Sequence, residues 1–235
     1  MKQIFTIAIS LIIMCWVTSC ANVNPDEKQS TQVSTIGKAT TMKQFVDINV
    51  VGAMQVFYSL GNNHTVRVEA QRETFEKLVI YVKENELYIS SKDENFGLDS
   101  LSMMNDVKVY VTSPSLCAVQ MTGEGAFTAS SPLDVSLLDI KLTGSGNITF
   151  NKKVNASKDL DVELTGSGTI DFSDLSSVKL KTQVTGSGSV NYENLSVEEA
   201  DSRITGSGSI NMRGAIDENS RTISGSGKIN VTHLN

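Results

Sequence analysis

The sequence predicts an all-β fold, a parallel β-helix built from rungs of roughly 20 residues that stack on one another. Three observations predict it. The phrase LTGSG at residues 142–146 returns as LTGSG, VTGSG, ITGSG and ISGSG, ending at residues 168, 188, 208 and 227. Apolar and polar residues alternate on both sides of each phrase, which is the period of a half-buried strand. No helical periodicity occurs there, and short strands with turns at fixed places are typical of a β-solenoid.

The chain begins with a lipoprotein signal peptide, predicted for residues 1–19. MKQ precedes the apolar run IFTIAISLIIMCWV, and small residues lead to Cys20. A charged start, an apolar centre and small residues before a cleavage point are typical of a signal peptide, and the run is too short for a confident membrane span. V-T-S-C is similar to the bacterial lipobox, so we expect lipidation of Cys20. An ordinary signal peptide with a chance cysteine is the alternative.

A lipid-anchored flexible linker is predicted for residues 20–38. The stretch after Cys20, ANVNPDEKQSTQVSTIGKATT, has few apolar residues and many Ser, Thr, Gln and Asn, a composition that cannot bury enough surface to fold. Asp26 and Glu27 would fit a signal for export to the cell surface, although two acidic residues are also ordinary in a solvated linker. The expected location is therefore the bacterial outer membrane, with surface exposure left open.

Composition restricts the partners and the redox chemistry. The formal net charge is −6, which argues against nucleic acid because phosphate binding needs clustered Lys and Arg. Without the signal peptide, and with Cys20 acylated, Cys117 has no cysteine to pair with, so packing must hold the fold together. The alignment puts Cys117 in the column of Leu138 and Leu160. It is expected to be a small core hydrophobe, with a reactive thiol as the alternative.

Residues 117–235 predict the regular TGSG-repeat β-helix, whose first clear corner is TGEG at residues 122–125. Opposite charges also meet at the outward positions of neighbouring rungs, because Lys141 would lie over Glu163, and Lys181 would lie between Asp161 and Asp201. The inward columns are expected to comprise Leu138, Ile140, Leu142, Ile148, Phe150, Leu160, Val162, Leu164, Ile170, Phe172, Leu180, Val184, Val190, Tyr192, Ile204, Ile210 and Met212.

Residues 39–116 predict irregular N-terminal β rungs. VDINVVGAMQVFY at residues 46–58 matches the repeat with Gly52 in the first glycine position and Met54 in the second. HTVRVEAQ, KLVIYVKENELYISS and DVKVYVTS indicate further strands, with ETFEKL as a short turn or helix. A bend is expected at Asn85 and Glu86, and a loop over residues 92–105.

The glycines of each T-G-S-G are predicted to turn a corner with backbone angles that residues bearing a Cβ resist. The flanking hydroxyls would then form ladders along one edge, which either hydrogen-bond internally or face a ligand. A purely structural role is the competing interpretation, since Gly and Ser are common in turns for conformational reasons. The candidate binding face comprises Thr143, Ser145, Thr165, Ser167, Thr185, Ser187, Thr205 and Ser207.

The chain resembles the auto-transporter adhesin head family, called the GIN domain, found in exported bacterial lipoproteins. The resemblance rests on FVDINVVGAMQVFY, LYIS, VKVYVTSPSL, the serial TGSG corners, SGSIN at residues 207–211 and SGKIN at residues 226–230. It covers the chain from about Phe45 to the C-terminus. It implies a right-handed parallel β-helix and an adhesin role, and it carries over no catalytic residues.

No catalytic, metal or cofactor motif stands out, so we predict that the protein is not an enzyme. His64 and His233 are expected to be solvated loop residues, and HExxH, CxxC, phosphate-loop and calcium-repeat motifs are lacking. Parallel β-helices include polysaccharide lyases and hydrolases, which use carboxylates and basic residues from adjacent rungs. Candidates for such a site are Asp139, Asp161, Glu163, Lys181, Asp201 and Arg203, although a solvated face of alternating charge is the simpler interpretation.

The expected function is a non-enzymatic binding or adhesion module for an extracellular glycan or protein. A polysaccharide-acting enzyme and a structural envelope component are the alternatives. The structural interpretation rests on the last rung, SGSGKINVTHLN, which ends after its second strand. Either the C-terminal residues fold over that end, or two copies meet there as a homo-oligomer.

Overall fold

The computed structural model describes residues 37, 39–92 and 105–233, which belong to one compact unit, Val33–Asn235. The predicted signal peptide, the lipidation of Cys20 and nearly all of the linker 20–38 lie outside these residues, as does most of the predicted loop 92–105. None of the helices in the described ranges is long and apolar enough to span a membrane.

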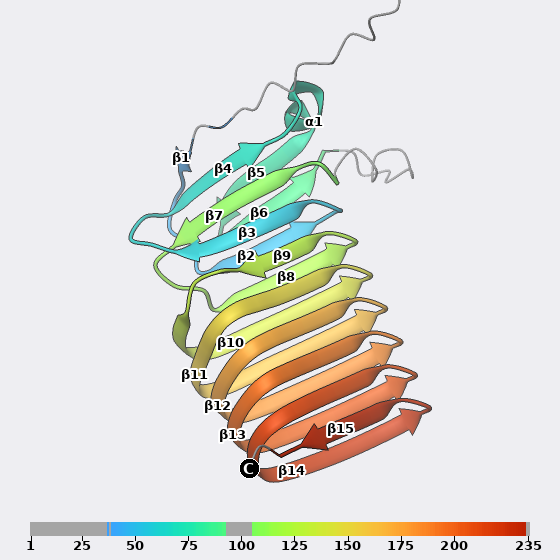
Figure 1. Ribbon diagram of the computed structural model, residues 1–235. Coiled ribbons are helices and arrows are strands. Elements are labelled where there is room, and N and C mark those ends of the chain that lie inside the picture. Colours follow the sequence, from blue (N-terminus) through green and yellow to red (C-terminus); the bar gives the residue numbers. More distant parts are fainter. Residues whose placement is uncertain (1–36, 38, 93–104, 234–235) are drawn as a thin grey trace, which may run out of the picture. The chain divides into compact units, whose positions relative to one another are not determined.

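The repeat region is a right-handed parallel β-helix, as predicted. The chain crosses a back sheet from left to right, turns at a glycine corner and returns across a front sheet, and a bend at the left leads it into the back sheet again (Figure 1). Neighbouring strands of this region all pair parallel. The strands are β8 (Ala118–Gly123), β9 (Ala126–Ala129), β10 (Leu133–Gly144), β11 (Asn147–Gly166), β12 (Thr169–Gly186), β13 (Ser189–Gly206), β14 (Ser209–Gly225) and β15 (Lys228–Thr232).

The N-terminal rungs do not follow chain order. In the back sheet β2 lies between β6 and β8, and in the front sheet β3 lies between β7 and β9, all parallel. Beyond them, β4 pairs with β7 and β5 pairs with β6, both antiparallel, and β1 pairs with β4. These elements are β1 (Thr40–Thr41), β2 (Asp47–Val51), β3 (Gln55–Leu60), β4 (Thr65–Glu69), α1 (Arg72–Glu76), β5 (Leu78–Lys83), β6 (Glu86–Ser91) and β7 (Lys108–Ser113).

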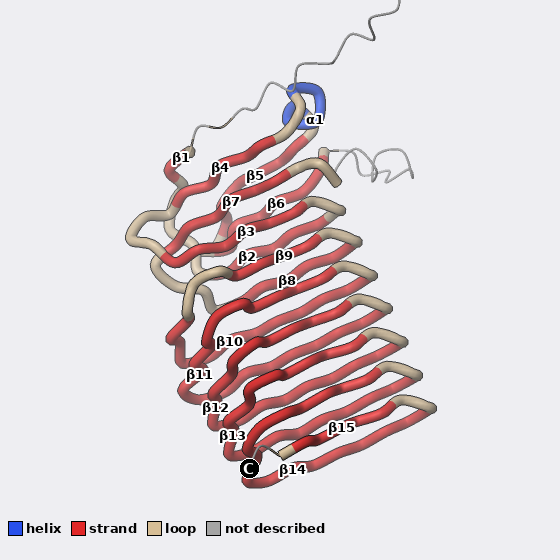
Figure 2. The backbone as a smooth tube through the Cα atoms, in the orientation of Figure 1, coloured by secondary structure: helices blue, strands red, loops and turns tan. Residues whose placement is uncertain are grey.

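The bend between β5 and β6 lies one residue before its predicted place. Glu84 and Asn85 form the turn, with φ angles of 54° and 64°. Glu86 already belongs to β6, because it pairs with Lys83. Two consecutive left-handed residues suit the twist of a two-residue hairpin. From β10 to β15 the tube is strand apart from the corners, whereas tan loops also join the strands before β10 and α1 adds a single helical turn (Figure 2).

The core is a stack of inward columns, and all the residues predicted to form it are buried. Aromatic rings follow one another along the axis from Tyr58 through Phe127, Phe150 and Phe172 to Tyr192. Phe150 and Phe172 stack with ring centroids 4.8 Å apart and planes 3° from parallel. Offset stacks add to the burial of the rings themselves.

Two inward columns become polar toward the C-terminal rungs, which the sequence analysis missed. Leu160 and Leu180 are followed in register by Ala200 and Asn219. The neighbouring column, Val162 in β11, ends at Arg221 in β14 by way of Thr182 and Ser202. Polar side chains in the last described rung lessen the apolar surface that this end presents. Self-association through this end stays a prediction.

The glycine corners form as predicted, and their geometry explains both glycines. Gly166 has φ of +122°, and the Gly144 carbonyl of the preceding rung accepts from the Ser167 and Gly168 amides at 2.9 and 3.1 Å. A Cβ on Gly166 would lie 2.3 Å from the Gly144 oxygen, and one on Gly168 would lie 2.5 Å from the Gly146 oxygen. The first glycine is therefore required for its backbone angle, and both are required because successive corners stack closely.

Candidate binding face

The hydroxyl ladder lies where the back sheet meets the glycine corners. Thr143, Thr165, Thr185 and Thr205 are consecutive register partners, and the serines Ser145, Ser167, Ser187 and Ser207 occupy the corners themselves. All eight side chains are exposed. Within the part of the chain that the structure describes, none of these hydroxyls makes a hydrogen bond to another protein group. The corners are held by backbone bonds instead, so the hydroxyls are free to meet a ligand.

Outward amides of the front sheet differ, because they bond to one another. Asn191, Asn211 and Asn230 each donate Nδ2–H to the preceding rung at 2.7 Å, and this amide ladder ends on the Asp171 carboxylate. Such ladders stabilise stacked strands. Their donors are therefore already used, whereas those of the corner hydroxyls are not.

A charged surface adjoins the hydroxyl ladder on the back sheet. Lys141 lies over Glu163 as predicted, with Nζ and Oε2 2.7 Å apart. Lys181 lies in register between Asp161 and Asp201, also as predicted. Exposed pairs of this kind contribute less than about 1 kcal/mol each, so they reveal register more than they add stability.

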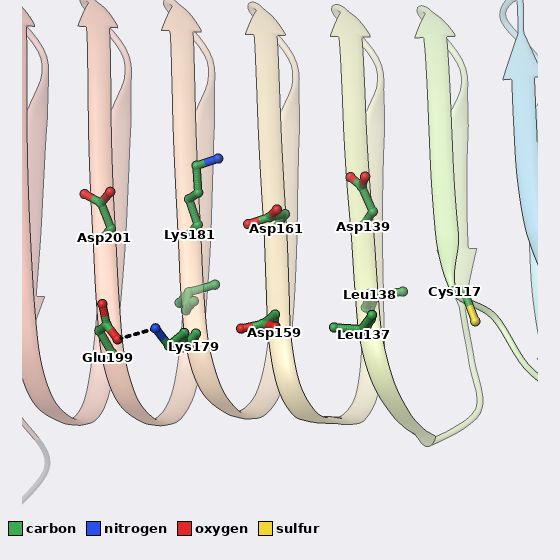
Figure 3. Close-up of a pocket in the computed structure, with 11 residues that line it drawn as sticks. Cys117, Leu137, Leu138, Asp139, Asp159, Asp161, Lys179, Lys181, Glu199 and Asp201 are labelled. Carbon is green, nitrogen blue, oxygen red and sulfur yellow. Dashed lines mark ion pairs between the residues drawn. The ribbon is translucent and has the colours of Figure 1, made fainter.

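A shallow depression of about 500 Å³ lies within this charged surface. Figure 3 shows Asp139, Asp161, Lys181 and Asp201 in one row across four strands, with Lys179 and Glu199 in the row beside it. Lys179 and Glu199 form an ion pair at 3.0 Å. Asp201 Oδ2 lies 3.7 Å from Arg203, while its buried Oδ1 has no hydrogen-bond partner among the described residues. The depression therefore offers, in Lys181, a cation without an ion-pair partner among those residues.

Asp139 is the carboxyl of this surface with a displaced pKa. Burial beside the depression raises the pKa of Asp139, and the charges of Asp161 and Glu163 raise it further, against the opposing effect of Lys141 and Lys181. The folded protein consequently holds a proton on Asp139 at a pH where the unfolded chain has lost it. This property favours general-acid chemistry only if a second catalytic group is close to the same substrate atom.

The displaced pKa of Asp139 predicts a pH dependence of stability. Because the folded-state pKa is the higher one, the contribution of Asp139 to stability should fall as pH rises from the ordinary aspartate value through the raised folded value. Asp139→Asn should therefore raise the free energy of unfolding at pH 7, by less than about 1 kcal/mol because the carboxyl is largely solvent-screened. Urea unfolding of both chains at pH 3 and pH 7 measures this change in the free energy of unfolding.

The exposed carboxyl of Asp217 provides the control for that comparison. Asp217→Asn should leave the free energy of unfolding within about 0.5 kcal/mol of the unaltered chain at both pH values. A loss of stability at pH 7 in Asp139→Asn would mean that attraction to the lysines outweighs burial, and the predicted fall in stability with rising pH would be wrong.

The charged sequence candidates occupy two outward columns of the back sheet. Asp139, Asp161, Lys181 and Asp201 lie in one row beside the depression, and Glu163 and Arg203 lie in the adjacent column. Asp201 and Arg203 are paired with each other, whereas Glu163 is paired with Lys141. Among the described residues no group of His, Cys, Asp and Glu could hold a metal ion. His64 is partly buried, with its ring against Phe45 at 5.0 Å, and is thus less solvated than predicted.

Cys117 corrects one expectation. It does occupy the register of Leu138, since the Cys117 carbonyl accepts from the amide of Asp139 at 2.9 Å. The side chain is nevertheless exposed at the rim of the depression (Figure 3). The preceding Leu116 is buried and takes the core position at the start of this rung, which turns Cys117 outward.

The N-terminal extension of this surface was missed. The column of Lys141 continues through Gln120, Asn49 and Tyr88 to Tyr81. Asn49 and Gln120 stand three residues before Gly52 and Gly123, as Lys141 does before Gly144, so glycine spacing could have found them. No glycine follows Tyr81 or Tyr88 at that spacing, so their position in this column depends on the order of the N-terminal strands.

Solved structures of bacterial proteins share this fold. A "putative adhesin" from Bacteroides fragilis is 20% identical with a TM-score of 0.60, covering 83% of this chain and 96% of that one. A "putative adhesin" from Parabacteroides merdae is 20% identical with a TM-score of 0.65, covering 84% and 95%. A "putative lipid binding protein" from Parabacteroides distasonis is 22% identical with a TM-score of 0.64, covering 83% and 95%. Comparison with curated proteins finds no match.

The fold and the outer surface define a class, the parallel β-helices that present repeated polar columns on flat sheets. Within that class the chain matches, over residues 44–233, the family described as "Putative auto-transporter adhesin, head GIN domain". The match spans most of the sequence, and the chain belongs to this family.

Proposed function

We propose that this chain is a non-enzymatic binding and adhesion module for an extracellular glycan or protein, held in the bacterial cell envelope by a lipid on Cys20. Residues 20–38 would serve as the tether between that anchor in the outer membrane and the β-helix. Membership of an adhesin family supports the binding role. The anchor rests on the sequence alone, and acylation at a single cysteine gives stable attachment when several chains are added.

One observation carries the proposal. Four rungs present the same two hydroxyls, exposed and unbonded within the described residues, beside a charged sheet. Parallel rungs repeat at about 4.8 Å, so an extended ligand could meet equivalent groups in successive rungs. Each contact is weak, and their sum grows with the number of rungs engaged.

A screen of the purified full chain against arrayed glycans and matrix proteins tests this function. We expect selective retention of one ligand class, with retained glycans recovered at their original length. Shortened glycan would instead support the polysaccharide-acting enzyme, in which Asp139 and Asp161 of the depression are the first residues to replace. An array without any retained ligand would contradict the binding function and favour a structural envelope component.

A further inference from the structure

An exposed aromatic pair lies at the N-terminal end of the back sheet. Tyr81 of β5 and Tyr88 of β6 stack with ring centroids 5.0 Å apart and planes 8° from parallel. Tyr81 is 44% exposed. Their shared outward side is the side that carries Lys141 and the threonine ladder, because the register continues across every strand between them. We call this pair the tyrosine platform.

Hydrogen bonds fix Tyr88, one ring of the platform, and Tyr81 stacks on it. The Tyr88 hydroxyl donates to Oε2 of Glu86, and Asn49 Nδ2 donates to Oε1 of the same carboxylate at 2.9 Å. The bond to Glu86 raises the pKa of Tyr88 to about 12, so its hydroxyl stays a donor at neutral pH. A ring held this way loses little freedom when a ligand packs on it.

Unused polar groups border the platform. The Tyr81 hydroxyl and the Gln120 side-chain amide make no hydrogen bond within the described residues. Asn49 keeps its amide oxygen as an acceptor, since only its Nδ2 is engaged. An aromatic face beside free amide and hydroxyl groups matches a pyranose ring, which presents C–H groups on one face and hydroxyls around its edge.

Negative charge next to the platform selects among sugars. Glu86 and Asp47 are register partners in the neighbouring column, and Asp139 follows beyond Ala118. Lys83 begins this column opposite Glu86, but its Nζ is paired with Glu84 at 3.7 Å, so three carboxyl groups face one cation that is already paired. Burial raises the pKa of Asp47, and the charges of Glu86 and Asp139 raise it further, as expected where carboxyl groups lie side by side. A uronic acid or a sulfated sugar would meet the same repulsion, whereas an uncharged hexose would not.

From this geometry we propose that the tyrosine platform is a stacking subsite for a neutral hexose unit of a glycan. The proposal rests on the binding function above and narrows it to one ligand class and one position. The glycan would extend from Tyr81 past Asn49 and Gln120 toward the threonine ladder.

Titration calorimetry with the purified full chain tests the subsite. The probes are neutral gluco-, manno- and galacto-hexaoses, with a galacturonate hexamer as the anionic comparison. We expect binding of at least one neutral hexamer, weaker binding of the galacturonate, and a dissociation constant at least about tenfold higher for Tyr81→Ala. Tyr81→Phe keeps the ring and removes only the hydroxyl, so it should bind the neutral hexamer more tightly than Tyr81→Ala does.

Leu60→Ala is the matched control, since Leu60 is also 44% exposed but lies in β3 of the front sheet. It should bind as the unaltered chain does, and unfolding midpoints of all variants check that Tyr81→Ala is folded. Neutral binding that Tyr81→Ala leaves unchanged would overturn the subsite but leave the binding function standing. If the array retained only anionic glycans or proteins, the assignment of a neutral hexose would be wrong, while the binding function would stand. Failure with every ligand would overturn both proposals.

Discussion

Replacing Gly166 by alanine is expected to destabilise the fold by about 3 kcal/mol or more. A residue with a Cβ held at a positive φ costs about 1–3 kcal/mol, and at Gly166 φ is +122°. The added Cβ would also lie 2.3 Å from the Gly144 carbonyl oxygen, which cannot move without disturbing the corner of the previous rung. Urea unfolding followed by circular dichroism measures the loss.

Ser167→Ala is the control for that substitution, because it alters the same corner. The Ser167 side chain is exposed, and only its backbone amide holds the turn. We expect a change within about 0.5 kcal/mol. A loss below about 1 kcal/mol for Gly166→Ala would show that the corner tolerates a side chain, and that neither the backbone angle nor the close approach strains it.

Truncating Phe172 should cost roughly 3–5 kcal/mol, the range for large aromatic residues in a packed core. The ring is buried between Phe150 and Tyr192, at centroid distances of 4.8 and 5.3 Å. Phe172→Ala would leave a gap in the middle of the aromatic column, and neighbouring rungs fixed by strand pairing can collapse into it only partly. The free energy of unfolding in urea is again the measurement.

Phe172→Leu separates loss of volume from loss of the stack. It keeps most of the apolar bulk and should cost less than about 1.5 kcal/mol. Equal costs for the leucine and alanine variants would contradict this expectation and mean that loss of the ring stack, rather than loss of volume, sets the cost.

The repeat region could be predicted because each of its signals is local. Alternation places Leu160, Val162 and Leu164 on one side of a strand, and the TGSG spacing then fixes which residues of successive rungs meet. The ion pair between Lys141 and Glu163 follows from that spacing alone. Because side chains alternate along a strand and only glycine fits the corner, one register between successive rungs is available.

The N-terminal rungs could not be ordered from the sequence. β2 pairs with β8 although about 70 residues separate Gly52 from Gly123, and no corner motif labels the strands between. For the same reason the tyrosine platform was missed, since Tyr81 and Tyr88 reach the back sheet only through this rearranged order. The outward side chain of Cys117 depends on Leu116 entering the core, a choice made by packing where the regular rungs begin.

The central claim is that the glycines of T-G-S-G carry the shape while its hydroxyls carry the binding. Its most direct test replaces the Thr and Ser of one, two, three and then four rungs by alanine, from Thr143 and Ser145 to Thr205 and Ser207. Affinity for the ligand retained on the array and the free energy of unfolding are measured on the same samples. We predict that affinity falls stepwise with each rung, while each substitution changes stability by no more than about 0.5 kcal/mol. Unchanged affinity with stability falling from rung to rung would contradict the claim and make the hydroxyl ladder structural.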